Sequence, residues 1–255
     1  MTAKNLLTLL FALSTATQGL AQPKEFVLHA PQVEGSPTAI WISRTYEEVF
    51  RRLNIPLRVL YLPHVRGAVM TEVGEVDGQF NRFHDYSDKY PNQIRVDEPI
   101  YSVVLTAVVP AGSDLQFDNS WQSFSDTGLK INYVRGIEAV EKSLKQHVDA
   151  NLLASVSYIH DGLVNLKYQH SDVFIHGYTA MKPYLDSGEF KDHLQLAGTI
   201  ERINLYPFVH RKHSALAPSI ASTLTQVKAE GLPMQYCMEA YGPGSEQLCR
   251  GVVPQ

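Results

Sequence analysis

The first half of the chain alternates short apolar runs with amphipathic segments. Apolar residues recur at Ile42, Tyr46 and Val49, which is the i, i+4, i+7 spacing of one helix face. Ser36-Pro37 precedes this stripe and is typical of a helix start, because proline suits the first helical position. The pattern predicts strands over 25–30, 57–62 and 78–83, with helices over 37–53 and from residue 63. This order, β-α-β-α-β, is typical of a doubly wound α/β sheet.

The second half of the chain repeats the alternation after a long β-type run over 94–110. We expect this run to be a strand that leaves one lobe for another. The pattern then predicts strands over 129–134, 152–157, 172–175 and 203–210, and helices over 140–148, 161–168, 179–185 and 214–230. The last helix and the tail behind it are expected to pack on the first lobe.

Two stretches in separate halves, 66–80 and 163–175, resemble each other. Each reads as a helix, an acidic residue at a junction, and the start of a strand. We interpret them as two α/β units, which indicates a two-lobed protein with a cleft between the lobes. Clefts of this kind are preferred sites for small molecules.

The N-terminus has the features of a secretory leader. Lys4 is followed by a mostly apolar run over 6–13, and small residues lead to Ala21. The apolar run is shorter than the roughly 20 residues that a membrane span needs, although an N-terminal anchor is the alternative. We expect residues 1–21 to be a signal peptide that is cleaved after Ala21, which leaves an exported protein.

The two cysteines, Cys237 and Cys249, lie close together near the C-terminus. In an oxidising compartment, an isolated close pair is most simply a disulfide that closes a surface loop. The chain-entropy relation gives such a short loop roughly 2–3 kcal/mol of stabilisation. A metal or redox role has little support, because the chain has no C-x-x-C motif and no histidine near the pair.

Composition and charge narrow the class of partner. The chain is 44% hydrophobic and 19% charged, which is typical of a globular protein with a real core. Its formal net charge of -4 argues against binding to nucleic acid or to an anionic membrane surface. The expected partner is therefore a small molecule or another protein.

Four segments in order along the chain, 62–82, 90–101, 129–144 and 206–231, carry a family resemblance. Together they resemble the periplasmic solute-binding proteins of ABC transporters, in the family 3 branch of polar amino-acid binders. The resemblance implies the type II fold: two α/β lobes joined by two hinge-crossing strands that close on a ligand. It also implies a periplasmic location and a discontinuous first lobe, with lobe 1 over 22–106 and 203–255 and lobe 2 over 107–202.

Two segments depart from the amino-acid binders. Those proteins carry an arginine after the first crossing strand that clamps the ligand carboxylate, whereas residues 111–119 contain none. They also carry Gly-Thr at a turn where this chain has Arg135-Gly136-Ile137. Both departures weaken the case for an amino-acid ligand.

Candidate ligand contacts follow from the rule that open α/β sheets bind ligands beyond the carboxyl ends of their strands. Arg66 begins a helix whose positive end favours anions, and Gly136 permits close approach to a ligand. The alternatives are a surface arginine at 66, a structural Asp77–Arg82 bridge, and tyrosines that pack in the core. The candidates are Tyr61, His64, Arg66, Asp77, Asn81, Arg82, Tyr101, Tyr133, Arg135, Gly136, Ser155 and Tyr206.

Metal and catalytic motifs are weak in this sequence. The nearest histidine pairs, His170/His176 and His210/His213, lack the helical spacing that zinc hydrolases use. The chain has no G-x-S-x-G elbow and no glycine-rich phosphate loop. We expect no metal and no cofactor, and a binding protein rather than an enzyme.

The leading hypothesis is a monomeric solute-binding protein that captures a small polar or anionic solute between its lobes. Its closed form would be recognised by a membrane permease or a sensor receptor. Two alternatives stay open. One is an exported enzyme on the same scaffold, and the other is a sensory or interaction module that has lost its ligand.

Overall fold

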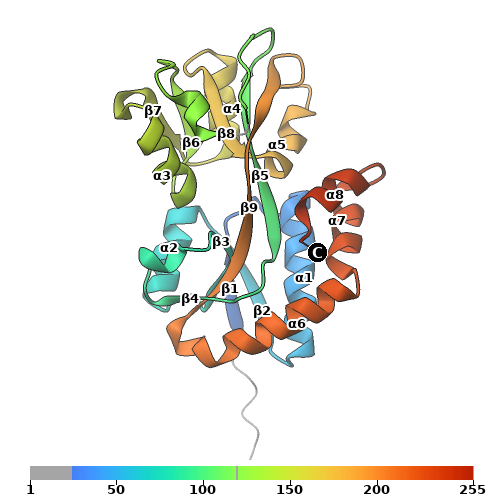
Figure 1. Ribbon diagram of the computed structural model, residues 1–255. Helices are drawn as coiled ribbons and strands as arrows, with labels where there is room; N and C mark the ends of the chain where they lie inside the picture. The colour runs from blue at the N-terminus through green and yellow to red at the C-terminus, as the bar shows by residue number, and fades with distance from the viewer. Residues whose placement is uncertain (1–24, 119, 255) are drawn as a thin grey trace, which may run out of the picture.

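Two α/β lobes, stacked one above the other in Figure 1, share two long strands that run through both. The structure is a computed structural model that describes residues 25–118 and 120–254. The predicted signal peptide, residues 1–21, lies outside these residues. Strands follow one another in the order β2-β1-β3-β9-β5-β8-β6-β7, with β4 paired to β9.

The lower lobe of Figure 1 is built on parallel strands. The central strand β1 pairs with β2 and β3 in parallel, and β3 and β4 pair with β9 in antiparallel. Helices α1 and α2 connect these strands, which confirms the predicted β-α-β-α-β order. The bounds are β1 Phe26–Ala30, α1 Pro37–Arg52, β2 Leu57–Tyr61, α2 His64–Glu72, β3 Gly78–Arg82, β4 Gln93–Arg95 and β9 Leu194–His210.

The upper lobe repeats this arrangement. Strand β6 pairs in parallel with β7 and β8, and β8 pairs in antiparallel with β5. The bounds are β5 Tyr101–Pro110, β6 Ile131–Val134, α3 Glu138–His147, β7 Leu153–Val156, α4 Ile159–Lys167, β8 Val173–Gly177 and α5 Tyr178–Leu185. Single turns of 3-10 helix lie at η1 Tyr86–Asp88, η2 Trp121–Phe124 and η3 Ala150–Leu152.

Strands β5 and β9 pair along their whole shared length, from Tyr101↔Leu205 to Pro110↔Leu194. They are the two strands that cross between the lobes (Figure 1). The prediction of one strand over 94–110 is wrong, because the chain breaks between β4 and β5. Pro99 lies in this break and has no N–H to offer a ladder. Strand β9 is also much longer than the predicted 203–210. The apolar pattern missed its first half because that half contains several polar residues.

The C-terminal region is helical beyond the predicted last helix. Helix α6 (Ala217–Ala229) begins later than the predicted residue 214, because a 3-10 segment, η4 (Arg211–Leu216), precedes it. Two helices that the pattern did not predict follow, α7 (Leu232–Tyr241) and α8 (Glu246–Val252). The predicted disulfide is confirmed: Cys237 on α7 is bonded to Cys249 on α8. Helix α7 packs on α1, and α8 packs on β5 (Figure 1).

Helix α1 is covered on two sides, which explains the position of Trp41. Trp41 does not belong to the apolar stripe of Ile42, Tyr46 and Val49 on this helix. The structure buries Trp41 at 1% exposure and packs it edge-on against Tyr101, with ring centroids 5.7 Å apart. Since α7 adds a second layer over α1, a residue off the main stripe becomes core. None of the helices in 25–118 and 120–254 combines the length and hydropathy of a membrane span.

Candidate ligand-binding cleft between the lobes

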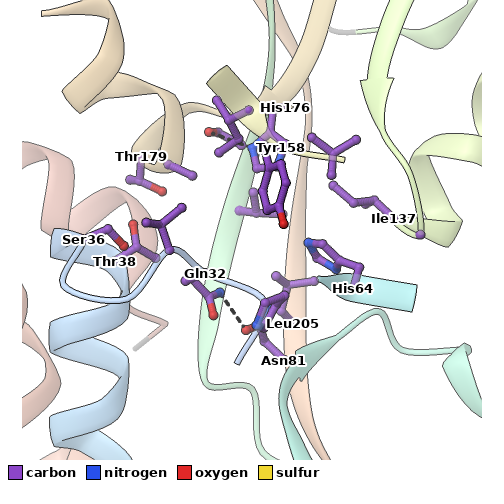
Figure 2. Close-up of a pocket in the computed structure, with 18 of the residues that line it drawn as sticks. Gln32, Ser36, Thr38, His64, Asn81, Ile137, Tyr158, His176, Thr179 and Leu205 are labelled. Carbon is purple, nitrogen blue, oxygen red and sulfur yellow. Dashed lines mark hydrogen bonds between the residues drawn. The ribbon is translucent and has the colours of Figure 1, made fainter. Parts of the chain in front are cut away.

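A cavity of about 410 Å³ lies between the two lobes. Figure 2 shows residues from both lobes around it. The rule that ligands bind beyond the carboxyl ends of parallel strands accounts for its position. The residues that follow the ends of β1, β2 and β3 line it from below, and those that follow β6, β7 and β8 line it from above. These residues include Gln32, Leu62 and Phe83 below, and Gly136, Tyr158 and Thr179 above.

Arg82, the last residue of β3, places a buried positive charge at the lower wall. Its exposure is only 3%. Its guanidinium donates to the Nδ1 atoms of His64 and His29, at 3.3 Å each, and to the Asn81 carbonyl at 3.0 Å. Its Nε has no hydrogen-bond partner within the described part of the chain. Among residues 25–118 and 120–254, no carboxylate forms an ion pair with Arg82.

The two imidazoles beside Arg82 are kept neutral by their surroundings. In His29, Nε2 donates to the Leu62 carbonyl at 2.8 Å, and Nδ1 lies 3.3 Å from Arg82 Nη2 and 3.2 Å from Gln79 Oε1. Burial, with the charge of Arg82 second, lowers the pKa of His29 to about 4 and that of His64 well below its ordinary value. His64 itself lines the cavity.

A pair of amides continues the lower wall. Gln32 Nε2 donates to Asn81 Oδ1 at 3.0 Å, the dashed line in Figure 2. This bond leaves Gln32 Oε1 as a buried acceptor without a partner in the described part of the chain. The lower wall thus places a buried positive charge, an imidazole and a pair of amides beside the cavity.

The upper wall is mostly apolar. Val134, Ile137 and Ile159 contribute aliphatic side chains, and Tyr158 lies between the labelled residues of the two walls in Figure 2. His176, at the end of β8, also lines the cavity, and burial lowers its pKa to about 4. As a neutral imidazole, His176 adds no charge. The described residues of the upper wall that line the cavity include no arginine or lysine.

Direct contacts join the lobes around the cavity. On one side, Lys89 Nζ lies 2.6 Å from Glu138 Oε1. On the other, the Tyr241 hydroxyl accepts from Thr38 Oγ1 at 2.7 Å and donates to the Thr179 carbonyl at 2.9 Å. These contacts mean that the structure shows the lobes closed on one another.

Gly136 of the upper lobe lies close against helix α2. It has a φ of +86°, and a Cβ built there would lie 2.8 Å from Val65 Cγ2 and 3.0 Å from His64 Cβ. Glycine is therefore required twice, by the left-handed backbone and by the proximity of the opposite lobe.

Eight of the twelve sequence-predicted contacts lie at the interlobe surface, in two groups. Arg66 and Arg135 face a separate, open hollow of about 470 Å³, where Arg135 donates to Ser157 Oγ at 3.0 Å. The remaining six line the cavity itself: Tyr61, His64, Asn81, Arg82, Tyr101 and Gly136.

The structure places Asp77 outside the cavity, which corrects the expected position. Asp77 precedes β3 and Arg82 ends it, so the two lie at opposite ends of the strand and form no bridge. Asp77 instead accepts from the Val27 N–H and pairs with His213 and Lys212, at 2.9, 2.7 and 2.8 Å. Its contacts are structural and join β1 to the chain that follows β9.

Three further candidates also lie outside the cavity. Ser155 is exposed on β7. Tyr133 and Tyr206 point away, because neighbouring residues of a strand face opposite sides, and their neighbours Val134 and Leu205 line the cavity instead. Tyr206 packs edge-on against His84, with ring centroids 5.6 Å apart.

Sequence reasoning missed several lining residues, chiefly Gln32, His176 and Thr179. The strand-end rule could have found Gln32, because it follows β1 by two residues, and Thr179, because it follows β8. His176 was weighed only as a metal ligand. In the described ranges, no group of three or more His, Cys, Asp or Glu side chains could hold a metal ion.

No protein-family model matches the sequence. An uncharacterized protein of Shewanella oneidensis is 27% identical over 201 residues, which cover 78% of this chain and 75% of that one.

Solved structures show the fold. A histidine kinase sensor domain with similarity to periplasmic binding proteins has a TM-score of 0.70 at 13% identity, over 87% of this chain and 97% of that one. The GluR0 ligand-binding core of Nostoc punctiforme, in complex with L-glutamate, has a TM-score of 0.68 at 13% identity, over 87% and 100%. AbpA of Streptococcus pneumoniae is an amino acid ABC transporter substrate-binding protein bound to L-arginine. Its TM-score is 0.67 at 15% identity, over 85% of this chain and 94% of that one.

The chain therefore has the two-lobed type II periplasmic-binding-protein fold, as the sequence resemblance implied. Proteins with which it shares this fold include solute-binding proteins and ligand-binding domains of sensors. At these identities the likeness establishes the architecture, and the ligand has to be argued from the cleft itself.

Proposed function

We propose that this protein is an exported solute-binding protein that captures a small anionic solute between its lobes. The closed, liganded form is then recognised by a membrane permease or a sensor receptor. The proposed role has three parts: the solute is an anion, the lobes close on it, and another protein recognises the closed form.

The observation that carries the proposal is the buried charge of Arg82. Taking an unpaired charge out of water costs several kcal/mol, which an anion in contact or close by offsets. The partners of Arg82 in the described chain are two neutral imidazoles and backbone carbonyls, and none of them carries a negative charge. A solute anion in the adjoining cavity would supply it.

Closure follows if the solute touches both walls. A ligand shifts a conformational equilibrium only by its difference in affinity for the two states. An anion held at Arg82 below and against Ile137 above binds the closed form better than the open one, because the open form offers only one wall. The cavity of about 410 Å³ is within the usual range for small-molecule sites, which supports a ligand-competent cleft over a ligand-free module.

The expected leader and the disulfide support export, since disulfides persist in oxidising compartments. Binding without turnover is supported by the structural neighbours, which are described as binding proteins and sensor domains. These neighbours suggest that a membrane permease or a sensor receptor recognises the closed form.

Thermal unfolding with a panel of solutes tests the proposal. The panel holds mono- and dicarboxylates, phosphate, acidic and neutral amino acids, and uncharged alcohols of matched size. We expect at least one anion to raise the melting temperature and to reduce the radius of gyration in small-angle scattering, and the alcohols to do neither. Stabilisation by uncharged compounds alone, or by no compound in the panel, would overturn the proposal.

A further inference from the structure

Helix α2, which lies below α3 in Figure 1, carries an apolar stripe that faces solvent. Val65, Val69 and Val73 recur at i, i+4 and i+8, and their exposed fractions are 41, 51 and 65%. The other face of the helix, with Gly67 and Ala68, is buried in the lobe. Valine forms helices less readily than alanine or leucine, so three exposed valines weaken this helix rather than support it. Exposed apolar residues that adjoin one another mark surfaces that contact a partner.

A hollow of about 470 Å³ adjoins this stripe and crosses from one lobe to the other. Val65, Val69 and Met70 line it from α2, while Arg135 and Ser157 line it from the upper lobe. Because the two sides belong to different lobes, a hinge motion that opens the cleft would separate them. The complete hollow is therefore a feature of the closed form.

Two cations without a carboxylate partner face this hollow. Arg66 comes from α2 and Arg135 from the turn after β6, and neither forms an ion pair within residues 25–118 and 120–254. The nearby acids of the upper lobe are already engaged: Glu138 forms the interlobe ion pair, and Glu141 accepts from the Gly136 N–H at 2.9 Å. Closure thus brings two like charges to one space, and a negative charge between them would offset their repulsion.

The acids of α2 and of the turn behind it lie away from these arginines. Glu72 ends the helix and accepts from the Asn92 N–H at 3.2 Å. Glu75 is exposed beyond Val73. The surface is therefore apolar along the helix and positive where the helix meets the upper lobe. This arrangement is complementary to apolar side chains followed by a carboxylate.

We infer that the downstream protein docks on a surface formed by Val65, Val69, Val73, Arg66 and Arg135, which we term the α2 face. The docking element is an apolar segment that carries a carboxylate. Its apolar side chains contact the valines, and its carboxylate lies between the two arginines. The inference rests on the proposed function, because it gives the surface by which the closed form is recognised. Since both arginines meet only on closure, the segment and the solute should each raise the affinity for the other by the same factor.

Three labelled peptides of twelve residues test this surface by fluorescence anisotropy on the chain from residue 22 onward. They share one stripe of leucines at helical spacing and differ only in the flanking residues, which are glutamate, glutamine or lysine. We expect the glutamate peptide to bind at least about 10-fold more tightly than the glutamine peptide, the usual gain from hydrogen bonds to charged groups. The lysine peptide is expected not to bind. Equal binding of the three peptides, or binding of none, would overturn the inference.

Two matched pairs of variants locate the contact. Val69→Ser should weaken binding of the glutamate peptide about 5-fold, the effect of losing part of one buried valine. Leu196→Ser, at a side chain of similar exposure (46%) on β9, should not weaken it. Arg66→Gln should remove the preference for glutamate over glutamine, while Arg58→Gln on β2 should keep it. If both variants of a pair behave alike, the peptide binds elsewhere and the inference is wrong.

Coupling to the cleft is tested with the anion that most stabilises the protein. It should tighten binding of the glutamate peptide by about 5-fold or more. Arg135→Gln should abolish this gain, because Arg135 joins the α2 face only when the lobes close. A wild-type affinity for the peptide that the anion leaves unchanged would contradict docking to the closed form.

The remaining outcomes distinguish other occupants of the α2 face. Binding to phosphatidylglycerol vesicles, or dimerisation in sedimentation, that is lost in Val69→Ser would assign the surface to a membrane or to a second copy and overturn the inference. If anions bind but the glutamate peptide does not dock on α2, the inference fails and the proposed function stands. If no anion binds in an Arg82-dependent way, the proposed function fails, and the inference that rests on it fails with it.

Discussion

The two walls of the cleft differ in kind. The lower wall carries Arg82, His64 and the Gln32–Asn81 pair, while the described upper wall is mostly apolar and brings Gly136 close to helix α2. Under the proposed function, the lower wall attracts and orients an anion, and the upper wall approaches it closely and excludes water. Recognition of charge and closure of the cleft then belong to different lobes.

The difference follows from how each wall is made. The polar groups of the lower wall sit at adjacent strand ends and hold one another through hydrogen bonds, so their positions are fixed before a ligand arrives. Preorganised polar groups give up less entropy on binding. Ile137 and Tyr158 of the upper wall follow strand ends as well, but offer shape rather than charge.

Removing the charge of the lower wall should have the largest effect. Arg82→Gln should weaken binding of the most stabilising anion by at least about 30-fold, since removing one partner of a buried charge contact costs about 2–5 kcal/mol. Calorimetry measures the change. Arg58→Gln, on strand β2 of the same lobe where Arg58 pairs with Glu25, serves as the matched control and should bind normally. Equal affinity in both variants would contradict the assignment of charge recognition to Arg82.

Acid should destabilise both walls, because each holds a neutral histidine. The pKa of His29 and that of His176 are lowered to about 4, by burial in both cases and by Arg82 in the first. Between pH 4 and 6.5 the unfolded chain therefore binds more protons than the folded one, so stability falls as pH falls. The slope is about 1.4 kcal/mol per pH unit for each histidine.

Urea unfolding at pH 7, 6 and 5 measures this dependence. His29→Gln and His176→Gln should each remove a share of the loss between pH 6 and 5, one for each wall. A free energy of unfolding that does not change over this range would show that these histidines titrate normally.

Keeping the lobes apart should weaken binding without touching the charge. Gly136→Ala places a methyl group against Val65 and His64 of the opposite lobe. Overpacking costs about 1–3 kcal/mol, on the order of 10-fold in affinity, and scattering should show a larger liganded particle. Gly112→Ala is the control, since Gly112 has a similar φ of +81° and no atoms within 4 Å of its Cβ position. If the control weakens binding equally, backbone strain rather than interlobe contact is the cause.

The contact made by the C-terminal helices should have the smallest effect. Tyr241→Phe removes the hydroxyl that joins Thr38 to Thr179 across the lobes. A hydrogen bond of this kind contributes about 0.5–1.5 kcal/mol, so affinity should fall by a few-fold. Tyr236→Phe on the same helix should have no effect, because the Tyr236 contact with the Arg44 guanidinium is made by its ring, which phenylalanine keeps. If both variants bind the anion like wild type, α7 does not contribute to closure of the cleft.

Much of the fold could be predicted from the sequence because its signals are local. Apolar periodicity located α1, and the strands of both lobes followed from short apolar runs. The first half of β9 was missed, since its polar residues carry no apolar pattern, and it is held by pairing with β5. Helices α7 and α8 were missed because their burial depends on α1, β5 and the disulfide rather than on a local stripe.

The candidate site was half predictable for a related reason. Strand ends were identified correctly, which brought Asn81, Arg82 and Gly136 to the cavity. Which of two adjacent residues faces the cavity depends on the strand register, so Tyr133 and Tyr206 were chosen where Val134 and Leu205 line it. The pairing of Arg82 with imidazoles rather than with Asp77 is a long-range arrangement that no local pattern encodes.

Native mass spectrometry of protein isolated without refolding tests the central claim most directly, because closed binding proteins retain their solute. The account predicts that wild type and Arg58→Gln carry the same bound small acid, and that Arg82→Gln carries none. The claim that an anion is held at Arg82 is contradicted if Arg82→Gln carries the same bound molecule. It is also contradicted if the wild-type protein is isolated without any bound molecule.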